Sequence, residues 1–185
     1  MLAVPAKIPN NKKLVQIAAQ GARDAGAEVT YLDLRDLPLP IFDEDLEARE
    51  GIPSNVKKLR EPMIAHQGFL IASPEYNSSI TAVLKNAIDW ASRSQPGEAP
   101  LACFKDKVAV LMSASPGALG GLPGLVHLRS ILGNLSIIVL PEQRAIGTAY
   151  STFTSEGGLQ DKEQQRAIEQ LSARLTEVVG KLNQT

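Results

Sequence analysis

The stretch GFLIASPEYNSSITAVLKNAIDWA covers residues 68–91 and changes its hydrophobic pattern once. Its first part, residues 68–73, is short and apolar on both faces, as is typical of a strand buried in a parallel sheet. After a loop at residues 74–79, apolar residues recur at helical spacing: Ile80, Val83, Leu84, Ala87, Ile88 and Ala91. A buried strand that leads into an amphipathic helix predicts an α/β fold.

The same alternation continues on both sides of this stretch. Toward the N-terminus we expect a helix over 11–25, a strand over 27–34, a loop over 37–46 and a helix over 54–66. Pro62 lies inside that last helix and predicts a kink or a break. Toward the C-terminus we expect strands over 107–115 and 135–141, a helix from Pro123 to about Leu132, and a terminal helix that includes 168–182. Trp90 lies off the apolar stripe of its helix, which favours a subunit contact over the core.

Strands that are apolar on both faces, joined by amphipathic helices, imply a three-layer, doubly wound parallel sheet. The expected strand order is 2-1-3-4-5. Only Met1–Val4 precedes the first helix, so we expect the first strand to be missing or truncated. Either the chain begins inside its natural reading frame, or the sheet is rearranged. We find no internal repeat or linker and expect one domain over residues 1–185.

Composition excludes several classes of protein. The 185 residues are 44% hydrophobic and carry 19 basic and 20 acidic side chains, a length and balance that suit one domain with a full core. A net charge of −1 argues against nucleic acid as a partner through bulk positive charge. No apolar run approaches the roughly 18–20 residues of a membrane span, and the N-terminus does not resemble a signal peptide. The single cysteine, Cys103, fits a reducing compartment, so we expect a cytoplasmic protein.

Ligands of open parallel sheets bind beyond the carboxyl ends of the strands, where loop 73–79 should lie. Pro74 stiffens this loop, and Ser78 or Ser79 can cap the helix that follows. Asn77 and the free N–H groups of the first helical turn offer hydrogen-bond donors, while Tyr76 offers a flat apolar face. This combination suits a planar, hydrogen-bonding heterocycle. A simple capped turn with Tyr76 packed against the protein is an equally open alternative.

Two further loops are expected at the same edge. Residues 113–121 have mostly small side chains, so their backbone can approach a flat ligand closely, although an ordinary mobile loop has the same composition. Residues 5–11 lead into the first helix, where Lys7, Lys12 and Asn11 could attract an anion. Prolines 5 and 9 remove N–H donors there, which makes a poor anion site.

Other catalytic arrangements find little support in the sequence. With only His66 and His127, there is no metal-binding spacing and no nucleophile–histidine–acid arrangement. The acidic run at residues 43–45 fits a solvated loop face, and Cys103 has no base near it in the sequence. We therefore assign no catalytic side chain and no metal ligand.

Three stretches together resemble a known family. They are SPEYNSSITAVLKNAIDWAS (73–92), DLRDLPLPIFDEDLE (33–47) and SASPGALGG (113–121). They resemble the NAD(P)H-dependent FMN reductase family of the flavodoxin-like superfamily, from about Asn11 to the end of the chain. The motif P-E-Y-N followed by L-K-N-A-I-D-W is the most specific part.

The resemblance implies an FMN-binding oxidoreductase that takes hydride from NADPH or NADH. Its electrons would pass to a small-molecule acceptor, such as a flavin, a quinone, an azo compound or a metal oxyanion. By the family pattern, the residues that line the flavin ring on its two sides are Pro74, Glu75, Tyr76 and Asn77, and Ser113, Ser115 and Gly117. The resemblance also implies a homodimer or homotetramer with the flavin near the subunit contact.

The chain departs from the family pattern at its start. The family motif G-S-x-R-x-x-S-x-N holds the FMN phosphate, and of its residues only Asn11 is matched here. We retain Asn11 as a cofactor-binding candidate. Losing the other contacts, roughly 1.5–3 kcal/mol each for charge-assisted bonds, would weaken FMN binding strongly. The alternative function is therefore a flavodoxin-like remnant with weak or no FMN binding that acts as an oligomerising or partner-binding module.

Overall fold

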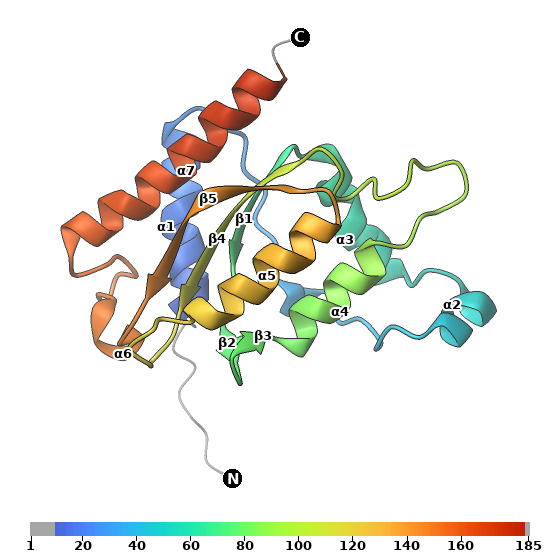
Figure 1. Cartoon of the computed structure of the whole chain (residues 1–185), viewed down its shortest axis with the longest axis horizontal. Helices are drawn as coiled ribbons and strands as arrows, with labels where there is room; N and C mark the ends of the chain where they lie inside the picture. The colour runs from blue at the N-terminus through green and yellow to red at the C-terminus, as the bar shows by residue number, and fades with distance from the viewer. Residues whose placement is uncertain (1–9, 184–185) are drawn as a thin grey trace.

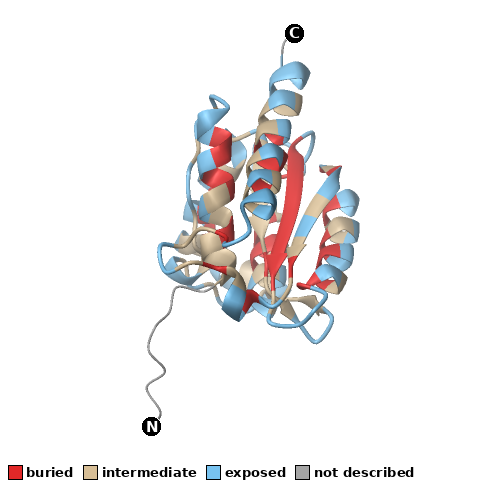
Figure 2. Cartoon of the chain, turned by 90° about the vertical axis from the view of Figure 1, so that its left-hand side faces the viewer, coloured by how far each residue is buried: buried red, intermediate tan, exposed pale blue. Residues whose placement is uncertain are grey.

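A computed structural model describes residues 10–183 of the chain and shows a parallel sheet between two layers of helices (Figure 1). Helices α1 and α7 cover one face of the sheet, and α3, α4 and α5 lie on the other. Figure 2 shows the sheet edge-on, with its central strand buried between the helices. The α/β fold and the parallel sheet predicted from the sequence are confirmed.

The elements follow the predicted alternation. The helices are α1 (Asn10–Asp24), α2 (Glu44–Glu50), α3 (Ser54–Ala65), α4 (Ala82–Ala91), α5 (Leu122–Asn134), α6 (Ala149–Thr152) and α7 (Lys162–Leu182), with a 3-10 turn η1 (Leu34–Asp36). The strands are β1 (Gly68–Ala72), β2 (Glu75–Tyr76), β3 (Ser79–Ile80), β4 (Val108–Ala114) and β5 (Ile138–Ile146). The short elements α2, α6, β2 and β3 are additions to the prediction.

The described sheet is parallel with the order β1-β4-β5, and the expected order 2-1-3-4-5 is not confirmed. The expected first strand, Met1–Val4, lies outside the described residues. The expectation of a strand over 27–34 is wrong, because these residues form an irregular segment that leads into η1. In the order 2-1-3-4-5 their partner would be the first strand, which would have to precede Asn10. The described residues therefore contain no counterpart of the first two strands.

The central strand β4 organises both halves of the core. All its residues are buried, and successive side chains point to opposite faces. Val108, Val110 and Met112 join the core under α1 and α7. Ala109 and Leu111 join the core under α4 and α5. Because both halves of the core hold β4 in place, the point at which the loop after β4 leaves the sheet is fixed.

The edge strand β5 tolerates an irregularity. It begins three residues later than predicted and continues past Pro141 to Ile146. Its register with β4 shifts between Val139 and Gln143, so Pro141 lies in the irregular part of an edge strand, where a missing N–H group costs little. Arg129 of α5 donates to the carbonyl oxygens of Val139 (3.2 Å) and Pro141 (3.4 Å) and stabilises this bend.

The helices differ from expectation at three residues. Pro62 does not break α3, because it lies close to the end of the helix and few intrahelical bonds depend on it; the expected kink stays a prediction. Trp90 is fully buried and donates its indole N–H to the Pro40 carbonyl at 2.8 Å, so it belongs to the core and not to a subunit contact. Val83 is 57% exposed, although its spacing placed it on the inner stripe.

The acidic run at residues 43–45 is not a loop face but the start of α2. The Asp43 carboxylate accepts hydrogen bonds from the N–H groups of Asp45 (2.8 Å) and Leu46 (3.0 Å). This is an N-cap, and the two acidic residues after Asp43 interact favourably with the positive end of the helix dipole. These carboxylates therefore have a structural explanation.

Candidate functional site

Two loops leave the sheet side by side. One follows β1 and the other follows β4, and because these strands are neighbouring and parallel, both loops emerge at the same edge. The ladder continues one residue past β1, where the Ser73 N–H donates to the Met112 carbonyl at 3.0 Å. In Figure 1 this edge is the lower end of the molecule, where β2 and β3 lie. The candidate site is this edge.

The loop after β1 is a small hairpin. Glu75 pairs with Ile80, and Tyr76 pairs with Ser79, which leaves a two-residue turn. The turn residues Asn77 and Ser78 have φ angles of +51° and +63°, as a type I′ turn requires. Asn is among the residues that tolerate this left-handed conformation best.

The hairpin changes which residue caps the following helix. The prediction that Ser78 or Ser79 caps it is wrong, because both are used in the hairpin. Thr81 is the cap of α4, and its hydroxyl accepts a hydrogen bond from the Leu84 N–H at 3.2 Å. The hairpin turn is therefore separate from the first turn of α4 and lies at the edge of the sheet.

The side chains at the tip of the hairpin point to solvent. Tyr76 is 65% exposed, so the alternative in which it packs against the protein is wrong. Asn77 is exposed as well, and no hydrogen bond of its side chain occurs within residues 10–183. Pro74 and Glu75 are half-buried at the base. The hairpin therefore offers an aromatic face and a free amide.

Close packing against α5 holds the hairpin in place. A Cβ atom at Gly124 would lie 3.2 Å from the Ser79 carbonyl oxygen and 3.3 Å from Glu75 Cγ, so the hairpin approaches α5 closely at this glycine. His127 adds a hydrogen bond between its Nδ1 and the Ser79 hydroxyl at 3.0 Å. The hairpin therefore packs directly on α5.

The loop after β4 lies directly on the end of β5. A Cβ atom at Gly120 would lie 2.7 Å from backbone atoms of Ala145, Ile146 and Gly147, and Gly120 has a φ angle of +62°. The Ser115 N–H donates to the Ile146 carbonyl at 3.0 Å. The alternative of a loop without fixed contacts is therefore excluded.

The two loops also touch each other. A Cβ atom at Gly121 would lie 2.6 Å from the Ser113 hydroxyl oxygen and 3.5 Å from Glu75 Cβ. The base of the hairpin and the start of α5 thus meet over Ser113. Residues 73–79 and 113–121 are therefore neighbours at this edge of the sheet.

The predicted residues of the second loop have different roles in the structure. Ser113 is fully buried, and its hydroxyl donates to the Gly120 carbonyl, so its side chain supports the loop from below. The Ser115 hydroxyl accepts a hydrogen bond from the Gly117 N–H at 3.3 Å. Gly117 is exposed, but its N–H is bonded to Ser115 and its carbonyl oxygen accepts from the Gly120 N–H at 3.1 Å, so it offers a ligand open space and not hydrogen-bonding groups. Leu119, which the sequence reasoning missed, is 66% exposed; its position between Gly117 and the Gly120–Gly121 pair was the available signal.

Asn11 forms a clamp between α1 and the sheet. Its Nδ2 donates to the Ala114 carbonyl at 2.8 Å, and its Oδ1 accepts from the Ala114 N–H at 2.9 Å. Both polar groups of the side chain are thus bonded to the last residue of β4. Its neighbour Lys12 forms an ion pair with Asp33. The rest of the predicted anion loop, residues 5–9 with Lys7, lies outside the described residues.

The remaining candidates for chemistry are structural. Cys103 is fully buried, and burial raises the pKa of its thiol, which keeps it protonated and unreactive. Within residues 10–183 no group of three or more His, Cys, Asp or Glu side chains could hold a metal ion. No helix in this same part of the chain is long and apolar enough to cross a membrane.

The exposed groups at this edge favour binding over acid–base chemistry. Tyr76 and Leu119 present apolar surface, while the Asn77 amide presents hydrogen-bonding groups. Such a set suits a planar ligand that is apolar on its faces and polar at its rim.

Comparison with known proteins gives a consistent result. Residues 2–151 match the family model described as NADPH-dependent FMN reductase. A NAD(P)H:quinone oxidoreductase of Solanum tuberosum is 35% identical over 177 residues, which cover 93% of this chain and 87% of that protein.

Solved structures share the fold. The flavoenzyme NAD(P)H:(acceptor) oxidoreductase FerB of Paracoccus denitrificans superposes with a TM-score of 0.78 at 25% identity and covers 96% of this chain and 93% of its own. A flavodoxin from the domain Archaea superposes with a TM-score of 0.59 at 10% identity, and the match covers 95% of this chain and 94% of the flavodoxin. The fold is therefore the flavodoxin-like α/β fold.

Proposed function

The chain belongs to the NADPH-dependent FMN reductase family, and on that premise we propose that it is an FMN-dependent NAD(P)H oxidoreductase whose acceptors are quinones, flavins or similar small molecules. The observation that carries the proposal is the contact between the hairpin at residues 75–80 and the loop at residues 115–121. We propose that one domain over residues 1–185 performs this function.

The residues at the edge fit the cofactor. Bound FMN supplies the redox chemistry, because its ring accepts hydride from a nicotinamide and releases electrons to an acceptor. We propose that Pro74, Glu75, Tyr76 and Asn77 line one side of the ring, and that Gly117 and Leu119 lie on the other. The small residues of the second loop allow close backbone approach, which is the feature that a flat ligand needs.

The protein's own contribution is to hold the flavin ring, to orient it and to polarise it. Backbone N–H groups and the Asn77 amide supply donors that are already in place, and such donors stabilise negative charge on a ligand without reorganising. No side chain at this edge has to transfer a proton for the ring to be reduced. The absence of a nucleophile–histidine–acid arrangement in the described residues therefore agrees with the proposal.

Ser113, Ser115 and Asn11 act on the ligand indirectly in this account. Ser113 supports the loop through Gly120, and Ser115 shapes the turn at Gly117. Asn11 fixes the end of β4 relative to α1. We therefore propose that these three are positioning residues.

Replacing Asn77 tests the hairpin. Asn77→Gly preserves the positive φ angle while removing the amide, so the turn keeps its shape. Losing one hydrogen bond of about 0.5–1.5 kcal/mol predicts roughly a two- to tenfold rise in the FMN dissociation constant. Ser78→Gly is the matched control, because it changes the other turn residue and should leave the constant unchanged. Equal constants for both variants would exclude Asn77 from the site.

His127→Ala tests the attachment of the hairpin to α5. It removes the bond to Ser79 while His127 itself is exposed, so we expect a small loss of stability, about 0.5–1.5 kcal/mol. FMN affinity should fall with it, because the hairpin is no longer fixed against the second loop. Urea unfolding and a flavin titration measure the two effects. Unchanged FMN affinity would show that this bond does not serve the site.

Assembly and location are further parts of the proposal. Leu122 and Val126 on α5 are exposed next to the hairpin, and Val83 on α4 adds a third apolar side chain. This surface supports a homodimer or homotetramer with the flavin near the contact.

The lone, buried thiol of Cys103 supports a cytoplasmic location.

Flavin absorbance of the purified protein tests the function. We expect saturable uptake of FMN and oxidation of NADPH or NADH in the presence of a quinone. A stable, colourless oligomer that takes up no FMN at roughly tens of micromolar would contradict the proposal and support a partner-binding module instead.

A further inference from the structure

A hollow of about 350 Å³ lies beside the second loop, between the end of β5 and helices α6 and α7. Ala118 and Gly147 form the wall nearest to the proposed flavin site. A Cβ atom at Gly147 would lie 2.6 Å from the Ala118 carbonyl oxygen, so the loop and the hollow share this wall. The hollow is therefore contiguous with the loop that we assign to the flavin, but it lies on the other side of that loop.

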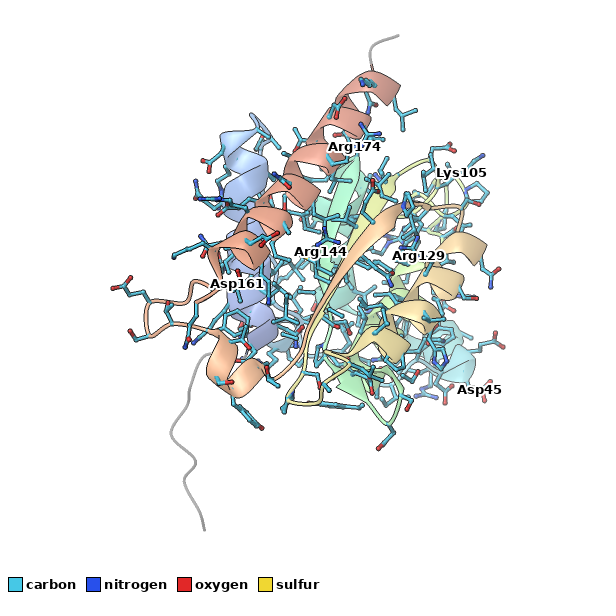
Figure 3. The ribbon with its side chains drawn as sticks, turned by 60° about the vertical axis from the view of Figure 1, so that its left-hand side comes forward. Asp45, Lys105, Arg129, Arg144, Asp161 and Arg174 are labelled. Carbon is cyan, nitrogen blue, oxygen red and sulfur yellow. The ribbon has the colours of Figure 1, made fainter. Side chains whose placement is uncertain are left out.

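The polar lining of the hollow selects for an anion. Arg144 belongs to it, and Figure 3 shows this residue between β5 and α7. Within residues 10–183 Arg144 makes no ion pair, and the hydrogen bond of its guanidinium is to the neighbouring Gln143 carbonyl at 3.1 Å. Among the described residues, none that lines the hollow carries a carboxylate. A cation without a partner in a space without acids favours a negatively charged ligand.

Two neutral donors complete this lining. Gln164 of α7 lines the hollow, and its side-chain amide makes no hydrogen bond to any of the described residues. The hydrogen bond of the Thr148 hydroxyl to the described part of the chain is to the Thr152 hydroxyl, at 3.4 Å, so this hydroxyl can also donate to a ligand. The Thr152 hydroxyl is already directed at the carbonyl oxygens of Gly147 and Thr148, both at 3.0 Å.

The remaining wall is apolar, formed by Ala118, Ala145, Ile146 and Ala167. A space lined both by apolar side chains and by a guanidinium with hydroxyl and amide donors suits a nucleotide, whose base is flat and whose phosphate is charged. At about 350 Å³, it is at the small end of ligand sites and can take one nucleoside phosphate, not a whole dinucleotide.

From these features we infer that the hollow binds the adenosine end of NADPH, with Arg144 on its 2′-phosphate. The inference rests on the proposed function, because that function brings NADPH to the neighbouring loop. An arginine is the usual means by which a protein accepts the 2′-phosphate that distinguishes NADPH from NADH. Arg144 thus becomes the residue that sets the preference for NADPH.

Arg144→Gln tests the inference in steady-state kinetics. Arg144 is exposed, so the variant should fold normally. Losing a charge-assisted contact to phosphate predicts a rise of roughly ten- to a hundredfold in KM for NADPH, with kcat and KM for NADH nearly unchanged. Arg166→Gln is the matched control, since Arg166 is an exposed arginine of α7 that does not line the hollow. An unchanged KM for NADPH, an equal rise for NADH, or the same rise in the control would overturn the inference.

Direct binding separates this inference from the proposed function. Calorimetric titration with adenosine 2′,5′-bisphosphate needs neither FMN nor turnover. We expect the wild-type chain and Arg166→Gln to bind this probe, and Arg144→Gln to bind it at least tenfold more weakly. If the protein oxidises neither NADPH nor NADH, the proposed function fails, while this titration still decides the hollow. Equal affinity in all three proteins, or no binding to any, would contradict the site.

Discussion

Gly120→Ala is expected to destabilise the protein by roughly 2–5 kcal/mol and to abolish tight FMN binding. A Cβ atom at this position would lie 2.7 Å from three backbone atoms of residues 145–147. Backbone atoms at the end of β5 cannot move aside as a side chain can, so the loop itself must lift. Overpacking of this kind costs about 1–3 kcal/mol, and a left-handed alanine adds about 1–2 kcal/mol. The lifted loop would separate Gly117 and Leu119 from the hairpin.

Gly157→Ala provides the matched control for this prediction. Gly157 also has a positive φ angle, +95°, but an added Cβ atom would meet nothing within 4 Å. It should therefore show the conformational cost alone, about 1–2 kcal/mol, with FMN affinity unchanged. Urea unfolding and flavin titration of both variants measure the difference. Similar losses in the two variants would mean that the contact of Gly120 with β5 is not needed.

Asn11→Ala is expected to cost about 2–4 kcal/mol, because it leaves the N–H and C=O groups of a buried residue without partners. Ala114 is 4% exposed, so water cannot readily replace the lost side chain. The end of β4 would then shift relative to α1, and with it the start of the second loop. Asn10→Ala is the control, since Asn10 makes no side-chain hydrogen bond to the described residues and should change stability by less than about 0.5 kcal/mol.

The same variant separates a positioning role from a direct contact with the phosphate of FMN. If Asn11 acts by positioning the loop, Asn11→Ala should weaken the binding of FMN and of riboflavin by the same factor. A variant that binds riboflavin normally and FMN poorly would instead show that Asn11 holds the phosphate. Flavin fluorescence titrations of the wild-type chain and of both asparagine variants measure these affinities.

The long elements could be predicted from sequence because their signals are local. The apolar run at residues 107–115 and the helical stripe of α4 each specify a structure without reference to the rest of the chain. The exit of two loops at one edge then follows from parallel strands. The segment at 27–34 was wrongly predicted because a strand forms only by pairing with another strand. The described residues contain no such partner for it.

The details of the site depend on contacts between distant parts of the chain. Asn11 and Ala114 are separated by 103 positions, and no local pattern connects them. Trp90 lies off its apolar stripe but is buried because Pro40, 50 positions away, accepts its N–H. The hairpin at residues 75–80 was missed because strands of two residues carry too little pattern, and its packing on α5 is what stabilises it.

Hydrogen exchange of the backbone amides, with and without FMN, tests most directly whether the two loops bind the ring together. The account predicts that FMN slows exchange in both residues 75–80 and residues 115–121, while the far end of the sheet is unaffected. Binding of FMN with slower exchange in only one of these segments, or in neither, would contradict it.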